Sequence, residues 1–233
     1  MDYRNNNKIN IHMLCATIRP DTFIGNHQRW IKAAKNKVRV KTIVAVNTEA
    51  EKRIIEEYDN TIEFRVCGDS MGICKPLYEI TKNLELEDNE IIIVVCDDVN
   101  CIPCWDVYVA NLMTNYKKAI FINDGLQNID NTVNPPITMP LMNYKVLKSL
   151  NKIIYHPTYN HYYADNELYH NLKELGLLID KRKDSLIFQH EHYDIGLRER
   201  DAIDNMVVDN CGYRDALIYT NRMAKSVYER LKI

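Results

Sequence analysis

Two kinds of segment alternate along the first half of the chain. Short apolar runs rich in β-branched side chains predict buried strands, and the segments between them place their apolar residues on one helical face. Thr48 and Glu51 form the pattern of a capping box, which marks the start of a helix. The predicted strands cover residues 9–18, 38–46, 62–67 and 90–96, and the predicted helices cover residues 26–37, 48–58 and 73–83. This order predicts βαβ units, and therefore an α/β fold with a mostly parallel central sheet flanked by helices.

The rhythm is less regular in the second half. Helices are predicted over residues 105–116, 143–150, 165–175 and 213–231, with short strands at 118–122 and 186–190 and a polar loop at 128–136. Gly176 follows the third of these helices, where a C-cap glycine is common. Since no repeat and no linker separates the halves, we expect a single domain over residues 1–233. Its parts are residues 9–100, residues 101–205 and a C-terminal helical segment at 206–233.

Composition narrows the class of protein. The 233 residues carry a net charge of −2, which argues against a basic nucleic-acid-binding module. No apolar run approaches the roughly 20 residues of a membrane span, and the polar, Asn-rich start lacks the apolar core of a secretory signal. The seven cysteines are an odd number at scattered positions, as expected of free thiols in a reducing compartment. We therefore expect a cytoplasmic protein without a membrane span.

Two adjacent carboxylates, Asp97 and Asp98, follow the most apolar predicted strand. In open α/β sheets ligands bind outside the carboxyl ends of the strands, and carboxylates there can hold a divalent cation. The simpler alternative is that the pair begins a turn, because Asp is a common turn residue.

Three other positions are candidates for chemistry. His190 and His192 are two residues apart at the end of a predicted strand, so both imidazoles could face one site, or they could end a solvated edge strand. Asp165 opens a predicted helix, where it could cap the helix or act as a base.

Several other motifs carry weaker signals. The segment 68–76 leads into a helix and could present backbone N–H groups and Lys75 to a diphosphate, although it is neither a P-loop nor a Rossmann fingerprint. Cys101 and Cys104 form a CxxC pair without a second pair at zinc spacing. A cluster of tyrosines could stack on a sugar or base, or surround a helix junction. These tyrosines are Tyr155, Tyr159, Tyr162 and Tyr163.

Taken in order, the segments from about residue 10 to 205 resemble the GT-A glycosyltransferases, and in particular the family-2-like inverting enzymes. Thr17-Ile18-Arg19-Pro20 is similar to the nucleotide-binding opening of that family. Asn47 stands where the family usually has an acidic residue that contacts the base, so the identity of the base is left open. The segment 68–75 is similar to the loop before the helix that lines the donor site.

The carboxylate pair also fits the resemblance. Asp97-Asp98-Val99, followed by Pro103 and Trp105-Asp106, is similar to the DxD motif of the family and its P-x-W-D continuation. When the sequence is aligned with the motif on Val99, Cys96 takes the position of its first acidic residue. Asp98 takes the position of the metal ligand, and Asp97 lies near the ribose or sugar.

The resemblance implies a GT-A (Rossmann-like) fold with a nucleotide-sugar-binding half at about residues 9–100 and an acceptor or catalytic half at about 101–205. It implies a metal-dependent, inverting transfer of a sugar from a nucleotide-diphosphate sugar, foremost a UDP-sugar, to a hydroxyl of a glycan or other acceptor, with Mn²⁺ or Mg²⁺. Asp165 resembles the general base, and His192, with His190 beside it, resembles the late histidine that completes the metal site. The implied donor-binding residues are Thr17, Arg19, Asn47, Lys75 and Asp97, and the implied metal ligands are Asp98, His192 and His190.

Two other functions remain open at this point. A nucleotidyltransferase shares the sheet and the carboxylate–metal chemistry, but it normally has a Gly-rich loop with a basic residue after the first strand, where residues 17–24 offer only Arg19. In a non-catalytic sugar- or nucleotide-binding module, Asp165 and His192 would face solvent or be structural. The net charge argues against a nucleic-acid acceptor.

Overall fold

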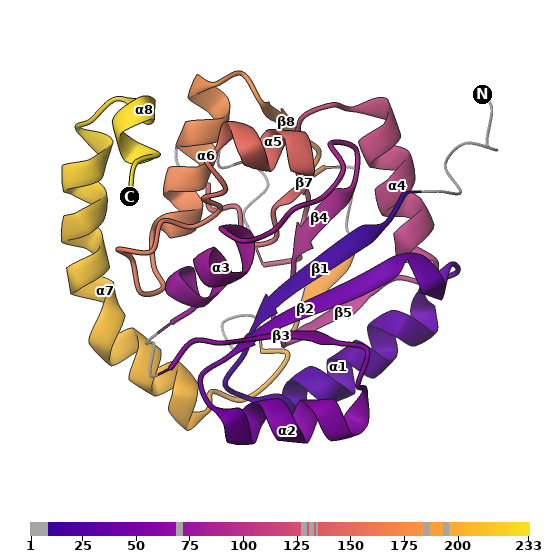
Figure 1. Ribbon diagram of the computed structural model, residues 1–233. Coiled ribbons are helices and arrows are strands. Elements are labelled where there is room, and N and C mark those ends of the chain that lie inside the picture. The colour runs from indigo at the N-terminus through magenta and orange to yellow at the C-terminus, as the bar shows by residue number, and fades with distance from the viewer. Residues whose placement is uncertain are drawn as a thin grey trace.

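The computed structural model describes residues 9–68, 72–126, 130, 133, 135–183, 187–192 and 196–233, with the backbone alone at 207–209. Helices and strands alternate through most of the chain (Figure 1). The strands are β1 (Ile11–Ala16), β2 (Val40–Val46), β3 (Glu63–Val66), β4 (Ile91–Val94), β5 (Val99–Cys101), β6 (Ala119–Phe121), β7 (Leu141–Asn143), β8 (Leu178–Asp180) and β9 (Phe188–His190). The helices are α1 (Pro20–Ala33), the 3₁₀ turn η2 (Lys37–Arg39), α2 (Glu49–Tyr58), α3 (Cys74–Thr81), α4 (Trp105–Asn115), α5 (Tyr144–Ser149), α6 (Ala164–Glu174), α7 (Ala202–Met223) and α8 (Val227–Arg230).

A seven-stranded sheet in the order β3-β2-β1-β4-β7-β6-β8 forms the centre of the protein. β1 pairs in parallel with β2 and β4, and β2 pairs in parallel with β3. β7 is antiparallel to both of its neighbours, while β6 and β8 are parallel to each other. The predicted mostly parallel sheet is therefore confirmed, with β7 as its reversed strand. Since β1, β2 and β4 run the same way, their carboxyl ends meet at one edge.

Side chains alternate between two cores on the two faces of the sheet. In β1, Leu14 packs into a cluster that includes residues of α3, α5 and α6, whereas Met13 packs into a cluster that includes residues of α1, α2 and α4. Both faces of β1 are buried, which is why its sequence reads as a continuous apolar run. Figure 1 shows helices on both sides of the sheet, with α7 along the outer side of the molecule.

A separate two-stranded sheet brings two distant parts of the chain together. β5 pairs antiparallel with β9, so that Val99 lies opposite His190 and Cys101 lies opposite Phe188. β5 follows directly after the carboxylate pair Asp97 and Asp98, which lies between β4 and β5. This pairing therefore places His190 beside Asp98.

The structure differs from the predicted elements in several places. α1 begins at Pro20 rather than at residue 26, and proline is favoured in the first turn of a helix. The helix predicted over 213–231 is helical at 213–223 and 227–230, but its bounds and continuity are wrong: α7 begins at Ala202 behind a capping box of Asp201 and Asp204, ends at Met223, and is followed by the separate helix α8. The strands β5, β7 and β8, of three residues each, were not predicted. The loop predicted over 128–136 lies largely outside the described residues, and the capping box of Thr48 and Glu51 is confirmed.

Candidate active site

A cavity of about 400 Å³ opens at the carboxyl ends of β1, β2 and β4. The first turns of α3, α6 and α7, together with His192 and Arg198 after β9, also contribute to its wall. Ligands bind at this edge in open α/β sheets, because the loops that leave the strands meet there. The cavity brings together most of the residues singled out in the sequence, namely Thr17, Arg19, Asn47, Asp97, Asp98, Asp165, His190 and His192. Lys75 is exposed in the first turn of α3 and lies outside the described lining.

Asp97 is held by side chains that follow β1. Its carboxylate accepts hydrogen bonds from Arg19 Nη2 at 2.7 Å and from Thr17 Oγ1 at 2.5 Å, and the backbone N–H of Arg19 donates to Thr17 Oγ1 at 2.9 Å. Asn26 donates to the backbone carbonyl of Asp97. Burial raises the pKa of Asp97, although the charge of Arg19 opposes that shift. Asp97 therefore positions Arg19 at the cavity.

Asp98 faces different partners from those of its neighbour. Oδ1 lies 3.0 Å from His190 Nε2, and Oδ2 accepts a hydrogen bond from Arg198 Nη2 at 3.2 Å. Burial opposes ionisation, but the hydrogen bond and charge of His190, together with Arg19 and Arg198, lower the pKa of Asp98 to about 2. Asp98 is therefore an anion at neutral pH, with one oxygen directed toward His190.

His190 ends β9 between two carboxylates. Its backbone N–H donates to the carbonyl of Asp124 at 2.7 Å, and its Nδ1 lies 3.9 Å from Asp124 Oδ2. Burial lowers the pKa of His190, but the carboxylates of Asp124 and Asp98 outweigh burial and raise it to about 9. The His192 ring lies edge-on to the His190 ring, with 5.1 Å between the ring centroids.

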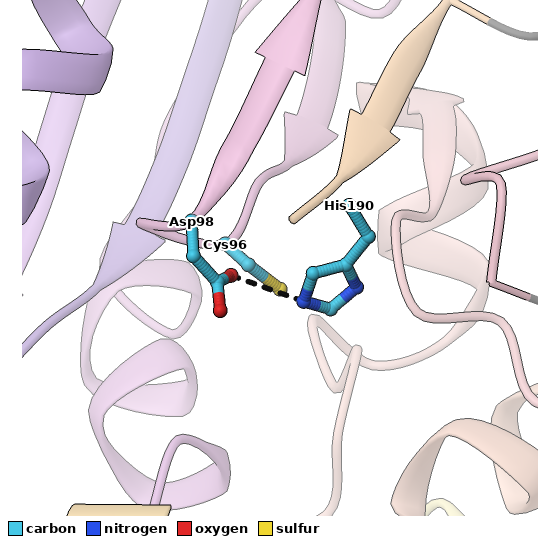
Figure 2. Close-up of side chains that lie close together, drawn as sticks. All are labelled: Cys96, Asp98 and His190. Atoms are coloured by element: carbon cyan, nitrogen blue, oxygen red, sulfur yellow. Dashed lines mark ion pairs between the residues drawn. The ribbon is translucent and has the colours of Figure 1, made fainter. Parts of the chain in front are cut away.

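Cys96, Asp98 and His190 form a compact group of potential metal ligands. One ligand atom from each of these residues lies within 4.8 Å of the others. Figure 2 shows the three side chains converging, with the Cys96 sulfur directed toward the His190 ring. Thiolate, carboxylate and imidazole are all protein ligands of divalent transition metals. The side chains present therefore fit a divalent cation.

Asp165 lies in the first turn of α6. The expectation that it caps the helix is wrong, because the N-cap residue is Tyr163, which has a left-handed φ of 66°. The Asp165 carboxylate accepts a hydrogen bond of 2.9 Å from the backbone N–H of Asn166. Burial raises the pKa of Asp165 to about 6. A carboxyl group with a pKa near neutrality is suited to general base catalysis.

Three residues of the site were missed in the sequence. Arg198 contacts both Asp98 and Asp204, Asp124 faces His190, and His161 lines the cavity. Arg198 stands in a run of charged residues that resembles a solvated surface, and Asp124 stands in an Asn-Asp-Gly sequence that is typical of a turn. No local pattern distinguishes either residue from a surface charge.

Neither a protein-family model nor a curated protein sequence matches the chain. Solved structures do match. The structure of S. aureus TarS 1–349 in complex with UDP-GlcNAc superposes with a TM-score of 0.60 at 14% identity, covering 96% of this chain and 72% of that one. The mannosyltransferase PcManGT from Pyrobaculum calidifontis, in complex with GDP-Man and Mn²⁺, gives a TM-score of 0.55 at 9% identity, over 76% of this chain and 56% of that one.

A third match is named for a different activity. A putative glucose-1-phosphate thymidylyltransferase from Bacillus anthracis gives a TM-score of 0.52 at 11% identity, over 89% of this chain and 99% of that one. In another structure of TarS 1–349, the match with the present chain covers 60% of the TarS chain. At these identities the likeness concerns the fold, and the chain has the GT-A fold, a single α/β domain with a mostly parallel sheet. Among the described residues, no helix is both long and apolar enough to cross a membrane.

Proposed function

We propose that the chain is a metal-dependent glycosyltransferase that moves a sugar from a nucleotide-diphosphate sugar to an acceptor hydroxyl with inversion. One observation carries the proposal. Asp165, with a pKa raised to about 6, lines the same cavity as the metal-ligand group that contains Asp98 and His190. Such a cavity holds both a base for the acceptor and an anchor for a cation at the leaving group.

In this proposal the donor occupies the side of the cavity formed by residues 9–100. Thr17, Arg19, Asn47 and Asp97 line it there, and the ligands bound in the TarS and PcManGT complexes favour a UDP- or GDP-sugar. Arg19 is fixed by Asp97 and by Asp201, whose Oδ2 accepts from its Nη1 at 3.1 Å. A guanidinium held in this way contributes positive charge near a diphosphate without a reorganisation cost.

The cation site consists of Asp98 and His190, with His192 beside them. A divalent cation held there, Mn²⁺ or Mg²⁺ in the first instance, neutralises charge on the leaving nucleoside diphosphate. PcManGT is described with Mn²⁺. Asp98 supplies an ionised oxygen for this site at neutral pH.

Asp165 accepts the proton of the acceptor hydroxyl. A single displacement by that hydroxyl inverts the configuration at the sugar carbon, and it needs one base on the acceptor side. In this proposal residues 101–205 form the acceptor and catalytic half, since Asp165 stands at the start of α6. The C-terminal segment 206–233 supports that half, and the seven free cysteines favour a cytoplasmic location.

The test is a donor screen with two readouts. The purified chain is incubated with UDP-sugars and GDP-mannose, with and without Mn²⁺ or Mg²⁺, and nucleoside diphosphate release is measured. We expect release that requires the cation and is lost in the Asp165→Asn variant.

The fold is shared with a nucleotidyltransferase, so the same protein is assayed with nucleoside triphosphates and sugar phosphates for pyrophosphate release. Pyrophosphate without nucleoside diphosphate would replace the proposal with nucleotidyl transfer. Donor binding without any release would indicate a binding module.

A further inference from the structure

Cys96 and Asp98 both follow β4, and one ligand atom of each lies within 4.8 Å of a ring nitrogen of His190. Asp97, between them, is directed instead to Arg19 and Thr17. The sulfur and the Asp98 carboxylate therefore both face His190 (Figure 2).

We propose that the Cys96 sulfur is a ligand of the cation site, so that the site prefers thiophilic divalent cations such as Co²⁺ and Zn²⁺ over Mg²⁺. This inference names the cation class of the site and rests on the proposed function. The GT-A resemblance places a carboxylate at position 96, so the sulfur is a property of this chain.

The geometry leaves suitable atoms for the ion. Asp98 Oδ2 is held by Arg198, and Oδ1 is the oxygen that lies 3.0 Å from His190 Nε2. An ion between Cys96, Asp98 and His190 takes the place of that Oδ1–Nε2 contact. Its binding releases the thiol proton of Cys96 and the Nε2 proton of His190 to solvent.

The chemistry of the three ligand atoms determines which cation the site prefers. Mg²⁺ takes oxygen ligands in octahedral geometry, and a sulfur ligand is foreign to it. Affinity for mixed nitrogen, oxygen and sulfur sites rises from Mn²⁺ to Co²⁺, and Zn²⁺ is bound readily by both sulfur and imidazole. Of the seven cysteines, Cys96 is the one that lies on the described lining of the cavity.

Co²⁺ provides a direct test, because a cobalt–sulfur bond gives a charge-transfer band in the near ultraviolet. The intact chain is titrated with Co²⁺ and its absorption is recorded beside calorimetric binding. The Cys96→Ser variant tests the ligand. The double variant Cys101→Ser/Cys104→Ser is the matched control, because it removes the CxxC pair, the other arrangement of thiols that could bind the ion.

We expect the band in the wild-type chain and in the double variant, and its loss in Cys96→Ser with Co²⁺ affinity weakened at least ~10-fold. A Cys96→Asp variant should bind Mn²⁺ and Mg²⁺ more tightly than the wild type does, without a band, which keeps the test valid if Cys96→Ser folds poorly. Bound Co²⁺ without a band in the wild type, or a band that survives in Cys96→Ser, would overturn the inference and leave metal-dependent transfer standing. A normal band without nucleoside diphosphate release from any donor would instead refute the proposed function.

Discussion

The buried carboxylate of Asp215 accepts a hydrogen bond of 2.8 Å from the backbone N–H of His161. The same carboxylate accepts hydrogen bonds from the backbone N–H groups of Tyr162 at 2.9 Å and Asn160 at 3.1 Å. His161 and Tyr162 line the cavity, and Asp215 belongs to α7. Helix α7 therefore fixes the cavity wall that leads into α6.

We expect Asp215→Asn to destabilise the chain by about 1–3 kcal/mol, because the amide replaces one acceptor oxygen of a buried side chain with an NH₂ group that faces backbone N–H donors. Urea unfolding measures the loss. Glu56→Gln, an exposed site on α2 with the same change of charge, is the control and should stay within ~0.5 kcal/mol of wild type. Equal stability of the two variants would show that the three hydrogen bonds contribute nothing to folding.

Asp165→Asn should lower sugar transfer by at least ~100-fold, because the amide keeps the shape of the side chain but cannot accept the acceptor proton. Steady-state transfer is compared with calorimetric donor binding, which we expect to survive. The Asn carbonyl can still accept the hydrogen bond from the Asn166 backbone. Transfer within a few-fold of the wild-type rate would remove Asp165 from the mechanism.

Asp165 also predicts how stability depends on pH. Its folded pKa of about 6 is above the ordinary value for Asp, so the unfolded chain ionises first and wild-type stability falls as the pH rises from about 4 to 6. The Asp165→Asn variant has no carboxyl group at this position, so this fall in stability with rising pH is absent from it. We expect the melting temperature of the variant to match that of the wild type near pH 4 and to exceed it near pH 7. A constant difference across that range would contradict the raised pKa.

His190→Ala should weaken Mn²⁺ binding more than His192→Ala does. His190 Nε2 lies 3.0 Å from Asp98 Oδ1 and belongs to the metal-ligand group, whereas His192 lies beside the His190 ring. The sequence resemblance alone favoured His192. Calorimetry with Mn²⁺ alone separates the two variants, and a larger loss in His192→Ala would restore the order that the sequence favoured.

Two glycines form a matched pair for backbone effects. Gly72 has a φ of 80°, and a Cβ there would lie 2.0 Å from the backbone oxygen of Asn160, whose N–H donates to Asp215. Gly25 lies within α1, and a Cβ there would meet nothing within 4 Å. We expect Gly72→Ala to lower the melting temperature and Gly25→Ala to add about 0.5–1 kcal/mol of stability. The melting temperatures of both variants test this expectation. An unchanged melting temperature in Gly72→Ala would show that the backbone at Gly72 and Asn160 can move apart at little cost.

The elements of the first half could be predicted from sequence because their signals are local. Apolar runs in β1, β2 and β4 are buried on both faces, and the capping box at Thr48 marks the start of α2. The start of α7 was missed because its capping box has Asp204 at the third position, where Glu or Gln is the usual signal. Strands of three residues, such as β5, are too short to show a period.

The site was predictable only in part for a related reason. Asp98 and Asp165 carry local signals, at a strand end and a helix start. The contact between Asp98 and His190 depends instead on the pairing of β5 with β9, which no local pattern reports. Arg198 is placed by tertiary contacts with Asp98 and Asp204.

The pairing of β5 with β9 has a consequence for ion exchange. The backbone N–H of Glu191 donates to the carbonyl of Asp98 at 2.8 Å, so the main chain clamps the two strands together next to the ligand side chains. Two ligands from distant segments are thereby preorganised as a chelate, and little conformational entropy is lost when an ion enters. In the proposed function, the side chains of Asp98 and His190 would stay assembled when the ion and the product leave, and no segment would have to refold before the next turnover.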